Sequence, residues 1–199
     1  MFLSRPSLIE ARDRGDVAIE SEDEIEFGPG SVTLHVSGLW YRLAAPAEVW
    51  LDRPDRLPRL EALAPGSTGH FSLSPRETAL VYSREKIGLG RSCFGLISGT
   101  SDLARVGVSV EFSWFVAPGF GLSRPSALVL EVFNANDAIV HFPSGMRIGH
   151  LLIGEYGRET NLGYESQAVS YNSNGDTAPN SKIAERHARN RSLVGSETP

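Results

Sequence analysis

Hydrophobic and polar residues alternate over short stretches of this chain. Residues 32–36 show the alternation clearly, with Val, Leu and Val separated by Thr and His, and this period of two is typical of β-strands with one buried face. We expect further strands at residues 70–73, 77–83, 93–98, 106–112, 127–134, 138–141 and 146–153. Turn-forming Gly, Pro, Ser, Asn and Asp separate almost all of them. Many short strands at this spacing predict a sandwich, jelly roll or distorted barrel.

One short helix is predicted near the N-terminus, from Ser7 to about Arg14. Ser7 and Glu10 have the spacing of a capping box, and Gly15 is a residue type that ends helices. Residues 44–69 show no clear period, so we expect a long surface loop with one or two short elements there. The expected organisation is one β domain over residues 1–180 and a flexible polar tail over residues 181–199, because the tail has too few large apolar residues to fold alone. An alternative is an arm that becomes ordered over a bound anion.

Composition narrows the class of protein. The net charge is −5, and a generally acidic chain is poorly suited to binding a nucleic-acid backbone. Cys93 is the one cysteine of the 199 residues, which excludes an internal disulfide, and its apolar neighbours predict that it packs in a strand. The longest apolar runs are about half of what a membrane span needs. We therefore expect a cytoplasmic protein that binds neither nucleic acid nor membrane.

Several catalytic motifs are absent from the sequence. A zinc-dependent nucleobase deaminase needs a set of His and Cys ligands that a single cysteine does not provide. There is no H-E-x-x-H, no phosphate-binding P-loop and no G-x-S-x-G. The five histidines lack the spacing of metal ligands and are interpreted as structural or solvated. A zinc site is therefore not expected.

Candidate chemistry is concentrated between residues 99 and 134. Ser101 and Arg105 are four residues apart and would share one side of a short helical turn. Glu131 interrupts an otherwise apolar strand, and a carboxylate buried there needs a partner such as an arginine. The alternative is that Glu131 points to solvent from a half-exposed strand.

The order of these motifs resembles the dCTP deaminase branch of the dUTPase superfamily. The chain has G-x-S-x-L-A-R-x-G from Gly99, a Pro-Gly-aromatic turn from Pro118, L-E-x-F-N from Leu130 and G-M-x-I-G-x-L from Gly145. The resemblance implies a mostly-β, distorted jelly-roll or β-barrel fold of dUTPase-like type with a short N-terminal helix. It also implies a homotrimer with active sites at subunit interfaces.

The activity that the resemblance implies is hydrolytic deamination of a cytosine nucleotide without zinc. Glu131 would activate the water that attacks the base, while Ser101 and Arg105 would orient the water and the carboxylate. A tuned carboxylate can take a proton from water and return it to the leaving amine. Mg²⁺ is expected, if at all, together with the phosphates of the nucleotide.

The chain departs from the family at several positions that contact substrate. Thr100 replaces an arginine that contacts phosphate, Ala117 replaces an aspartate, and Trp114 and Phe115 replace smaller or polar residues. We retain these four as substrate-binding candidates, together with the tyrosines Tyr164 and Tyr171. The two aromatics either shape a base-binding pocket or fill the core or the trimer interface.

Three functions remain open from the sequence. The first is a deaminase with a changed substrate, such as a cytosine nucleotide with fewer phosphates or a modified sugar. The second is a dUTPase-like pyrophosphatase, which the loss of carboxylates at Thr33 and Ala117 disfavours because phosphate attack uses carboxylate-bound Mg²⁺. The third is a non-catalytic nucleotide-binding or structural trimer.

Overall fold

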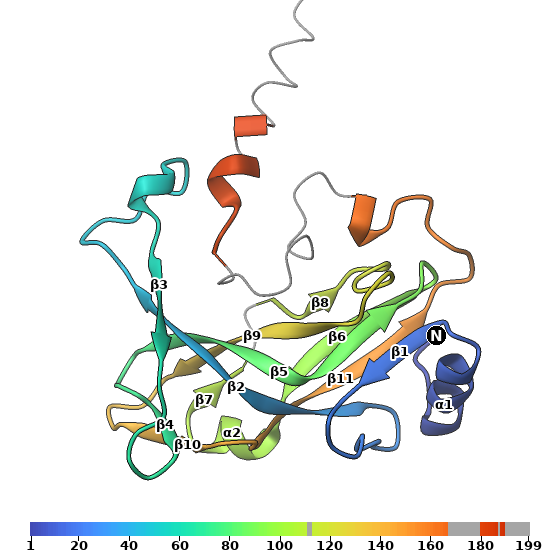
Figure 1. The fold of residues 1–199 in the computed structure, drawn as a ribbon, viewed down its shortest axis with the longest axis horizontal. Helices are drawn as coiled ribbons and strands as arrows, with labels where there is room; N and C mark the ends of the chain where they lie inside the picture. Colours follow the sequence, from blue (N-terminus) through green and yellow to red (C-terminus); the bar gives the residue numbers. More distant parts are fainter. Residues whose placement is uncertain (111–112, 167–179, 187, 190–199) are drawn as a thin grey trace, which may run out of the picture.

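A computed structural model describes residues 1–110, 113–166, 180–186 and 188–189 of the chain. It is a strongly curled β structure with one N-terminal helix at its side (Figure 1). The helices and 3₁₀ turns are α1 (Arg5–Asp13), η1 (Pro54–Arg56), α2 (Ser101–Arg105) and η2 (Tyr164–Ser166). The strands are β1 (Val17–Glu20), β2 (Val32–Ala44), β3 (Arg59–Leu63), β4 (His70–Leu73), β5 (Thr78–Leu89), β6 (Cys93–Gly99), β7 (Val108–Ser109), β8 (Phe115–Val116), β9 (Ser126–Asn134), β10 (Val140–Pro143) and β11 (Arg147–Glu155).

Within the described part of the chain, nine strands form one sheet in the order β7-β9-β5-β2-β11-β6-β8, with β1 added to β5 and β3 added to β2. All of these pairs are antiparallel. A second sheet pairs β10 with β4. The pairing register shifts within β2, β5 and β11. Irregular pairing of this kind bends strands and allows a sheet to curl. The prediction of a mostly-β, jelly-roll-like fold with a short N-terminal helix is confirmed.

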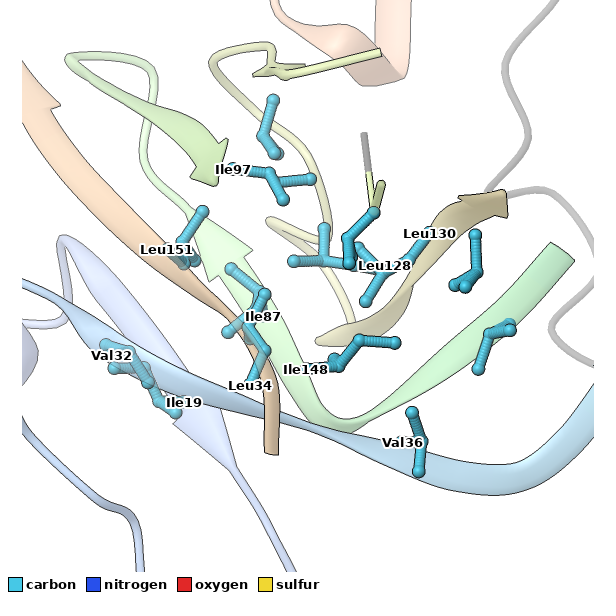
Figure 2. Close-up of a cluster of buried hydrophobic side chains, with 14 of the residues drawn as sticks. Ile19, Val32, Leu34, Val36, Ile87, Ile97, Leu128, Leu130, Ile148 and Leu151 are labelled. Carbon is cyan, nitrogen blue, oxygen red and sulfur yellow. The ribbon is translucent and has the colours of Figure 1, made fainter. Parts of the chain in front are cut away.

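The core lies inside the curled sheet, where alternate residues of each strand point. In β5 the buried positions alternate with partly exposed ones along most of the strand, as the two-residue period of a strand requires. Leu34, Ile87, Leu130 and Leu151 from four different strands meet there (Figure 2), each at 1% exposure or less. Burying a side chain of this size contributes about 1.5–3 kcal/mol, so this interior is the main source of stability.

Helix α1 begins two residues earlier than predicted. Ser4 is the N-cap residue but makes no side-chain cap hydrogen bond, so the predicted capping box starting at Ser7 is wrong. Pro6 lies in the first turn, where a residue without an N–H is well tolerated. Gly15 has φ +83° and ends the helix as predicted, because a glycine adopts this conformation without steric cost.

Most strands lie where the alternation placed them, but several bounds differ. β4 (His70–Leu73) agrees with the prediction, whereas β5 continues six residues past the expected end to Leu89 and β2 continues to Ala44. The expected loop at residues 44–69 contains η1 and β3. β1 and β8 were not predicted.

Part of the predicted tail is described. Residues 183–186 are helical, and Ala184 is only 6% exposed. The division into a domain at 1–180 and a flexible tail at 181–199 stays a prediction. Over the described residues, no helix has the length and apolar character needed to cross a membrane.

Candidate active site

Glu131 lies on the outer side of β9. Its neighbours Leu130 and Val132 are buried in the core, so the alternation of the strand turns Glu131 the other way, where it is half-buried. The backbone N–H of Ser113 donates a hydrogen bond to Glu131 Oε2 at 3.3 Å. The carboxylate is therefore neither enclosed in the core nor simply solvated, and a backbone donor orients it.

Helix α2 presents Ser101 and Arg105 at the surface. Thr100 is its N-cap residue, and the Thr100 hydroxyl accepts a hydrogen bond from the N–H of Leu103 at 3.3 Å. Leu103 is 4% exposed and anchors the turn, while Ser101 and Arg105 are exposed. The predicted short helical turn is confirmed, and the side chain of Thr100 serves as a cap within it.

The described residues of one chain do not bring Arg105 to Glu131. Arg105 Nη1 lies 3.2 Å from Asp102 Oδ1, and its side chain is 76% exposed. Asp102 is one helical turn away on the same short element, so this pair forms without ordering any distant segment. The expected Arg105–Glu131 pair is therefore not made within one chain.

Residues 113–120 begin at the contact with Glu131, because Ser113 donates its N–H to that carboxylate. Trp114 and Phe115 are 56% and 46% exposed, so they do not fill the core of the chain, while the alternatives of a base-binding pocket and a trimer interface stay predictions. Ala117 precedes a turn whose Pro118 carbonyl accepts a hydrogen bond from the N–H of Tyr164 at 2.6 Å. Two substrate-binding candidates, Ala117 and Tyr164, thus lie beside the same turn. The candidate Tyr171 lies outside the described residues.

The turn after Ala117 depends on glycine. Gly121 has φ +61°, and a Cβ on it would lie 2.2 Å from the carbonyl oxygen of Ile87. A side chain at this position therefore collides with the backbone of β5. The aromatic ring of Phe120 packs edge-on against that of Tyr164, with centroids 5.4 Å apart, which holds the turn and η2 together.

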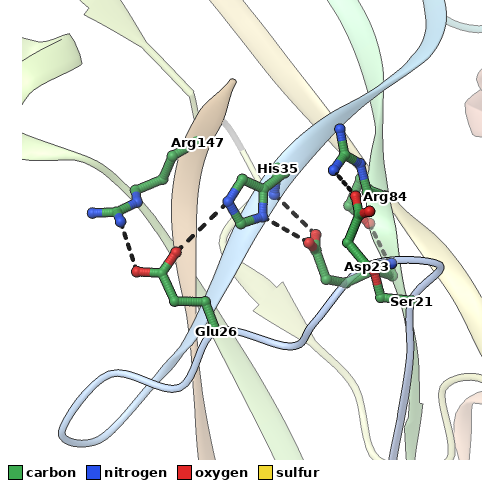
Figure 3. Close-up of polar contacts among 8 residues, drawn as sticks. Ser21, Asp23, Glu26, His35, Arg84 and Arg147 are labelled. Atoms are coloured by element: carbon green, nitrogen blue, oxygen red, sulfur yellow. Dashed lines mark hydrogen bonds and ion pairs between the residues drawn. The ribbon is translucent and has the colours of Figure 1, made fainter. Parts of the chain in front are cut away.

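A buried carboxylate that the motif analysis did not identify lies on β5. Glu85 is 3% exposed and accepts hydrogen bonds from the backbone N–H of His35 at 2.9 Å and from the ring, with Nδ1–Oε1 at 2.8 Å. The other ring nitrogen of His35 lies 3.7 Å from Glu26, which also pairs with Arg147 (Figure 3). The interpretation of His35 as structural agrees with these contacts. Glu85 stands between Arg84 and Lys86, so no local pattern marked it as buried, and its partner lies 50 residues away.

Cys93 is fully buried at the start of β6. Burial raises the pKa of its thiol above the usual value, and a contact with the Ser92 hydroxyl opposes this only in part. A protonated, enclosed thiol is a poor nucleophile, in keeping with the predicted packing role.

No group of three or more His, Cys, Asp or Glu that could hold a metal occurs among the described residues. A hollow lies between residues 54–60 and residues Asn180 and Ser181, and it contains none of the candidate residues. Mg²⁺ arriving with the phosphates, and a reaction without zinc, stay predictions.

Comparison with known proteins identifies relatives over most of the chain. The chain is 27% identical over 157 residues to a "dCTP deaminase, dUMP-forming" from Persephonella marina, covering 78% of this chain and 84% of the relative. It is 25% identical over 183 residues to the protein of the same name from Corynebacterium efficiens, covering 90% and 92%.

A solved structure shows the same fold. The 2′-deoxycytidine 5′-triphosphate deaminase from Agrobacterium tumefaciens superposes with a TM-score of 0.55 at 15% sequence identity. The match covers 78% of this chain and 48% of that one, so this chain spans about half of that structure's length.

One protein family matches the sequence over nearly the whole β structure. The dCTP deaminase-like family model aligns with residues 2–155, which contain the candidates from Thr100 to Glu131. This protein is therefore a member of the dCTP deaminase-like family.

Proposed function

We propose that this protein is a homotrimeric enzyme that deaminates a cytosine deoxynucleotide by zinc-free hydrolysis. The observation that carries the proposal is the family match across residues 2–155, combined with a carboxylate that faces outward and is held by a backbone N–H. Such a group can exchange protons with a water molecule on the accessible side of β9.

Glu131 is the proposed general base and general acid. It takes one proton from water as the oxygen bonds to C4 of cytosine, and it passes this proton to the exocyclic nitrogen, which leaves as ammonia. The second water proton ends on N3 of the product, so cytosine and water give uracil and ammonia. The hydrogen bond from Ser113 holds Oε2 of the carboxylate, and a carboxylate held in one orientation is better placed for proton transfer.

Ser101 and Arg105 are proposed to reach Glu131 of a neighbouring subunit. Both side chains are exposed on α2, and among the described residues Arg105 forms a surface pair with Asp102. A surface ion pair contributes about 0–1 kcal/mol, so a second carboxylate in a subunit interface can compete for this guanidinium. The trimer proposed here brings the three groups into one site.

The named relatives suggest an additional step. The relatives from Persephonella marina and Corynebacterium efficiens carry the description "dUMP-forming", and conversion of dCTP into dUMP requires loss of both ammonia and pyrophosphate. We therefore propose that this chain is a candidate for two hydrolyses at one site. The first would release ammonia from the base, and the second would release pyrophosphate from the triphosphate.

A nucleotide panel tests the proposal. The protein is incubated with dCTP, dCMP, deoxycytidine and their uracil counterparts, with and without Mg²⁺, and products are followed by mass and by ammonia release. Ammonia release from a cytosine compound supports deamination. Pyrophosphate release without ammonia supports a dUTPase-like enzyme. Ligand-induced thermal stabilisation without turnover supports a non-catalytic binding protein.

The Glu131→Gln variant tests the assigned base. We expect its turnover to fall by about 10²–10⁴-fold, because the amide cannot take the proton from water, while the oligomeric state stays unchanged. Glu61→Gln is the control, since Glu61 is exposed on β3. Normal turnover by Glu131→Gln would show that another residue is the base.

A further inference from the structure

The turn that follows β9 holds the end of helix α2. Asn136 lies two residues past the end of β9, and its side-chain Nδ2 donates hydrogen bonds to the carbonyl oxygens of Val106 at 2.7 Å and Gly107 at 3.3 Å. The backbone N–H of Ala135 donates to the same Gly107 oxygen at 2.9 Å. Carbonyl groups at the end of a helix have no partner within the helix, so the turn supplies partners for the two residues that follow Arg105.

Buried hydrogen bonds fix the side chain of Asn136 itself. Asn134 is fully buried, and its Oδ1 accepts hydrogen bonds from the backbone N–H and the side-chain Nδ2 of Asn136 at 3.0 and 3.1 Å. The Nδ2 of Asn134 donates to three carbonyl oxygens, those of Leu73, Ser74 and Ala138, at 3.1, 2.9 and 2.8 Å. Because the Asn134 amide has acceptors for its nitrogen and donors for its oxygen, its orientation is determined, and this in turn determines the position of Asn136.

Gly107 allows the close approach between Asn136 and the end of α2. Its φ is +73°, and a Cβ on Gly107 would lie 2.8 Å from Oδ1 and 2.9 Å from Nδ2 of Asn136. Any other side chain at position 107 would therefore displace the amide, whereas glycine adopts a positive φ without steric cost. The backbone of residue 107 and the side chain of residue 136 thus fit together as one contact.

Helix α2 is short and is anchored at both ends. It has five residues, of which Leu103 is buried, and the Thr100 hydroxyl caps its start. A helix of this length is not stable on its own, so the contacts around it set its direction. Arg105 directly precedes Val106, and the contact at that end of the helix is the one that Asn136 makes.

We propose that Asn136 is a positioning residue for Arg105. The inference rests on the proposed function, in which Arg105 acts on Glu131 of a neighbouring subunit. The side chain of Arg105 is 76% exposed, so the orientation of α2 sets the direction in which it leaves the chain. By binding the residues directly after Arg105, Asn136 presets this direction, and a group that is already oriented loses less entropy when the site forms.

The variant Asn136→Ala removes the two side-chain hydrogen bonds to the end of α2. We expect its kcat for deamination to fall about tenfold to a hundredfold, with KM within about twofold, because a misoriented group slows the chemical step more than it weakens substrate binding. Asp137→Ala is the matched control, since Asp137 lies in the same turn, is 91% exposed and pairs with Arg76. Its kcat should stay close to that of the wild type. Circular dichroism with thermal melting checks that both variants are folded, and a folded Asn136→Ala with wild-type kcat would overturn the positioning role.

Two mixed assemblies distinguish the positioning of Arg105 from a general loosening of the fold. In the first, Asn136→Ala/Glu131→Gln chains are unfolded and refolded together with Arg105→Ala chains, so each restored site uses an Arg105 that Asn136 no longer positions. In the second, Asn136→Ala/Arg105→Ala chains are refolded with Glu131→Gln chains, so each restored site uses an Arg105 that Asn136 still positions.

Both mixtures contain the same three substitutions and differ only in which chain carries Asn136→Ala. We expect turnover to be at least about tenfold lower in the first mixture than in the second. A first mixture that is as active as the second, or two inactive mixtures, would overturn the proposal.

Amide hydrogen exchange separates this inference from the proposed function. The N–H groups of Val106 and Gly107 bond to the carbonyls of Leu103 and Ala104, each at 3.1 Å, and their exchange should be about tenfold faster in Asn136→Ala. If the wild type turns over no cytosine compound, the deaminase proposal is overturned, and faster or unchanged exchange then supports or overturns the anchoring of α2 by Asn136. If the wild type deaminates, and neither kcat nor exchange changes in Asn136→Ala, the positioning role is overturned and the deaminase proposal stands.

Discussion

At the scale of single residues, the local surroundings of each polar group determine its state. Glu131 is flanked by core residues yet faces outward, whereas Glu85, between Arg84 and Lys86 in the sequence, is 3% exposed and held by two hydrogen bonds from His35. The sequence analysis identified Glu131 as an acid within a strand, but it ended the preceding strand at Ser83, before Glu85. It did not show which of the two is enclosed, because that depends on which face of β5 or β9 packs against the core.

The buried thiol of Cys93 predicts a pH dependence of stability. Because burial raises its pKa in the folded state, only the unfolded chain ionises as the pH passes about 8.5. The free energy of unfolding is therefore unaffected by the thiol below that pH. It falls as the pH rises toward the pKa of the folded state, because ionisation favours the unfolded chain. Urea unfolding from pH 7 to 10 should show a steeper loss of stability in the wild type than in Cys93→Ala. Equal slopes would mean that the thiol does not contribute.

At the scale of elements, β5 shows what a local pattern misses. The predicted strand ended at Ser83, because Arg84, Glu85, Lys86 and Gly88 are more typical of a turn. In the structure the strand continues to Leu89, since His35 of β2 binds Glu85 and β1 pairs with residues 86–89. These are long-range contacts, which no window of neighbouring residues contains.

The contact between β2 and β5 gives a prediction about stability. Glu85→Gln should lower the free energy of unfolding by about 1–3 kcal/mol, because the amide cannot accept both hydrogen bonds from His35 in a buried site. Glu26→Gln is the control. Glu26 is 45% exposed and 3.7 Å from the same ring, so a change within about 1 kcal/mol is expected. Chemical denaturation of the two variants should separate them, and similar losses would contradict the assignment of Glu85 as the main partner.

At the scale of the whole molecule, the fold was more predictable than the site. Strand alternation and turn residues were enough for a mostly-β, jelly-roll-like architecture, and the motif order indicated the family. The relation of Arg105 to Glu131 was not predictable, because a sequence does not say whether two groups meet within one chain or between chains. In this chain Arg105 binds Asp102, and its contact with Glu131 between subunits stays a proposal.

Mixing two inactive variants tests whether the site is shared between subunits. Arg105→Ala and Glu131→Gln chains are unfolded together, refolded and assayed. If each site takes its base from one subunit and its arginine from the next, random assembly of equal amounts leaves about one quarter of the sites intact. About that fraction of wild-type turnover is then expected.

The control mixture combines Arg105→Ala with Ser101→Ala. Both changes lie on the same helix α2, so no neighbouring chain supplies an intact copy and turnover should stay absent. Recovery in neither mixture would argue that the three groups act within one chain.

The two ends of the main sheet have a further consequence. β7 and β8, the terminal strands of the path, are each two residues long, so each offers very few free backbone N–H and C=O groups. A strand from another molecule gains little by adding itself at either of these two ends, and this disfavours edge-to-edge growth there, the growth that leads β proteins into fibrils.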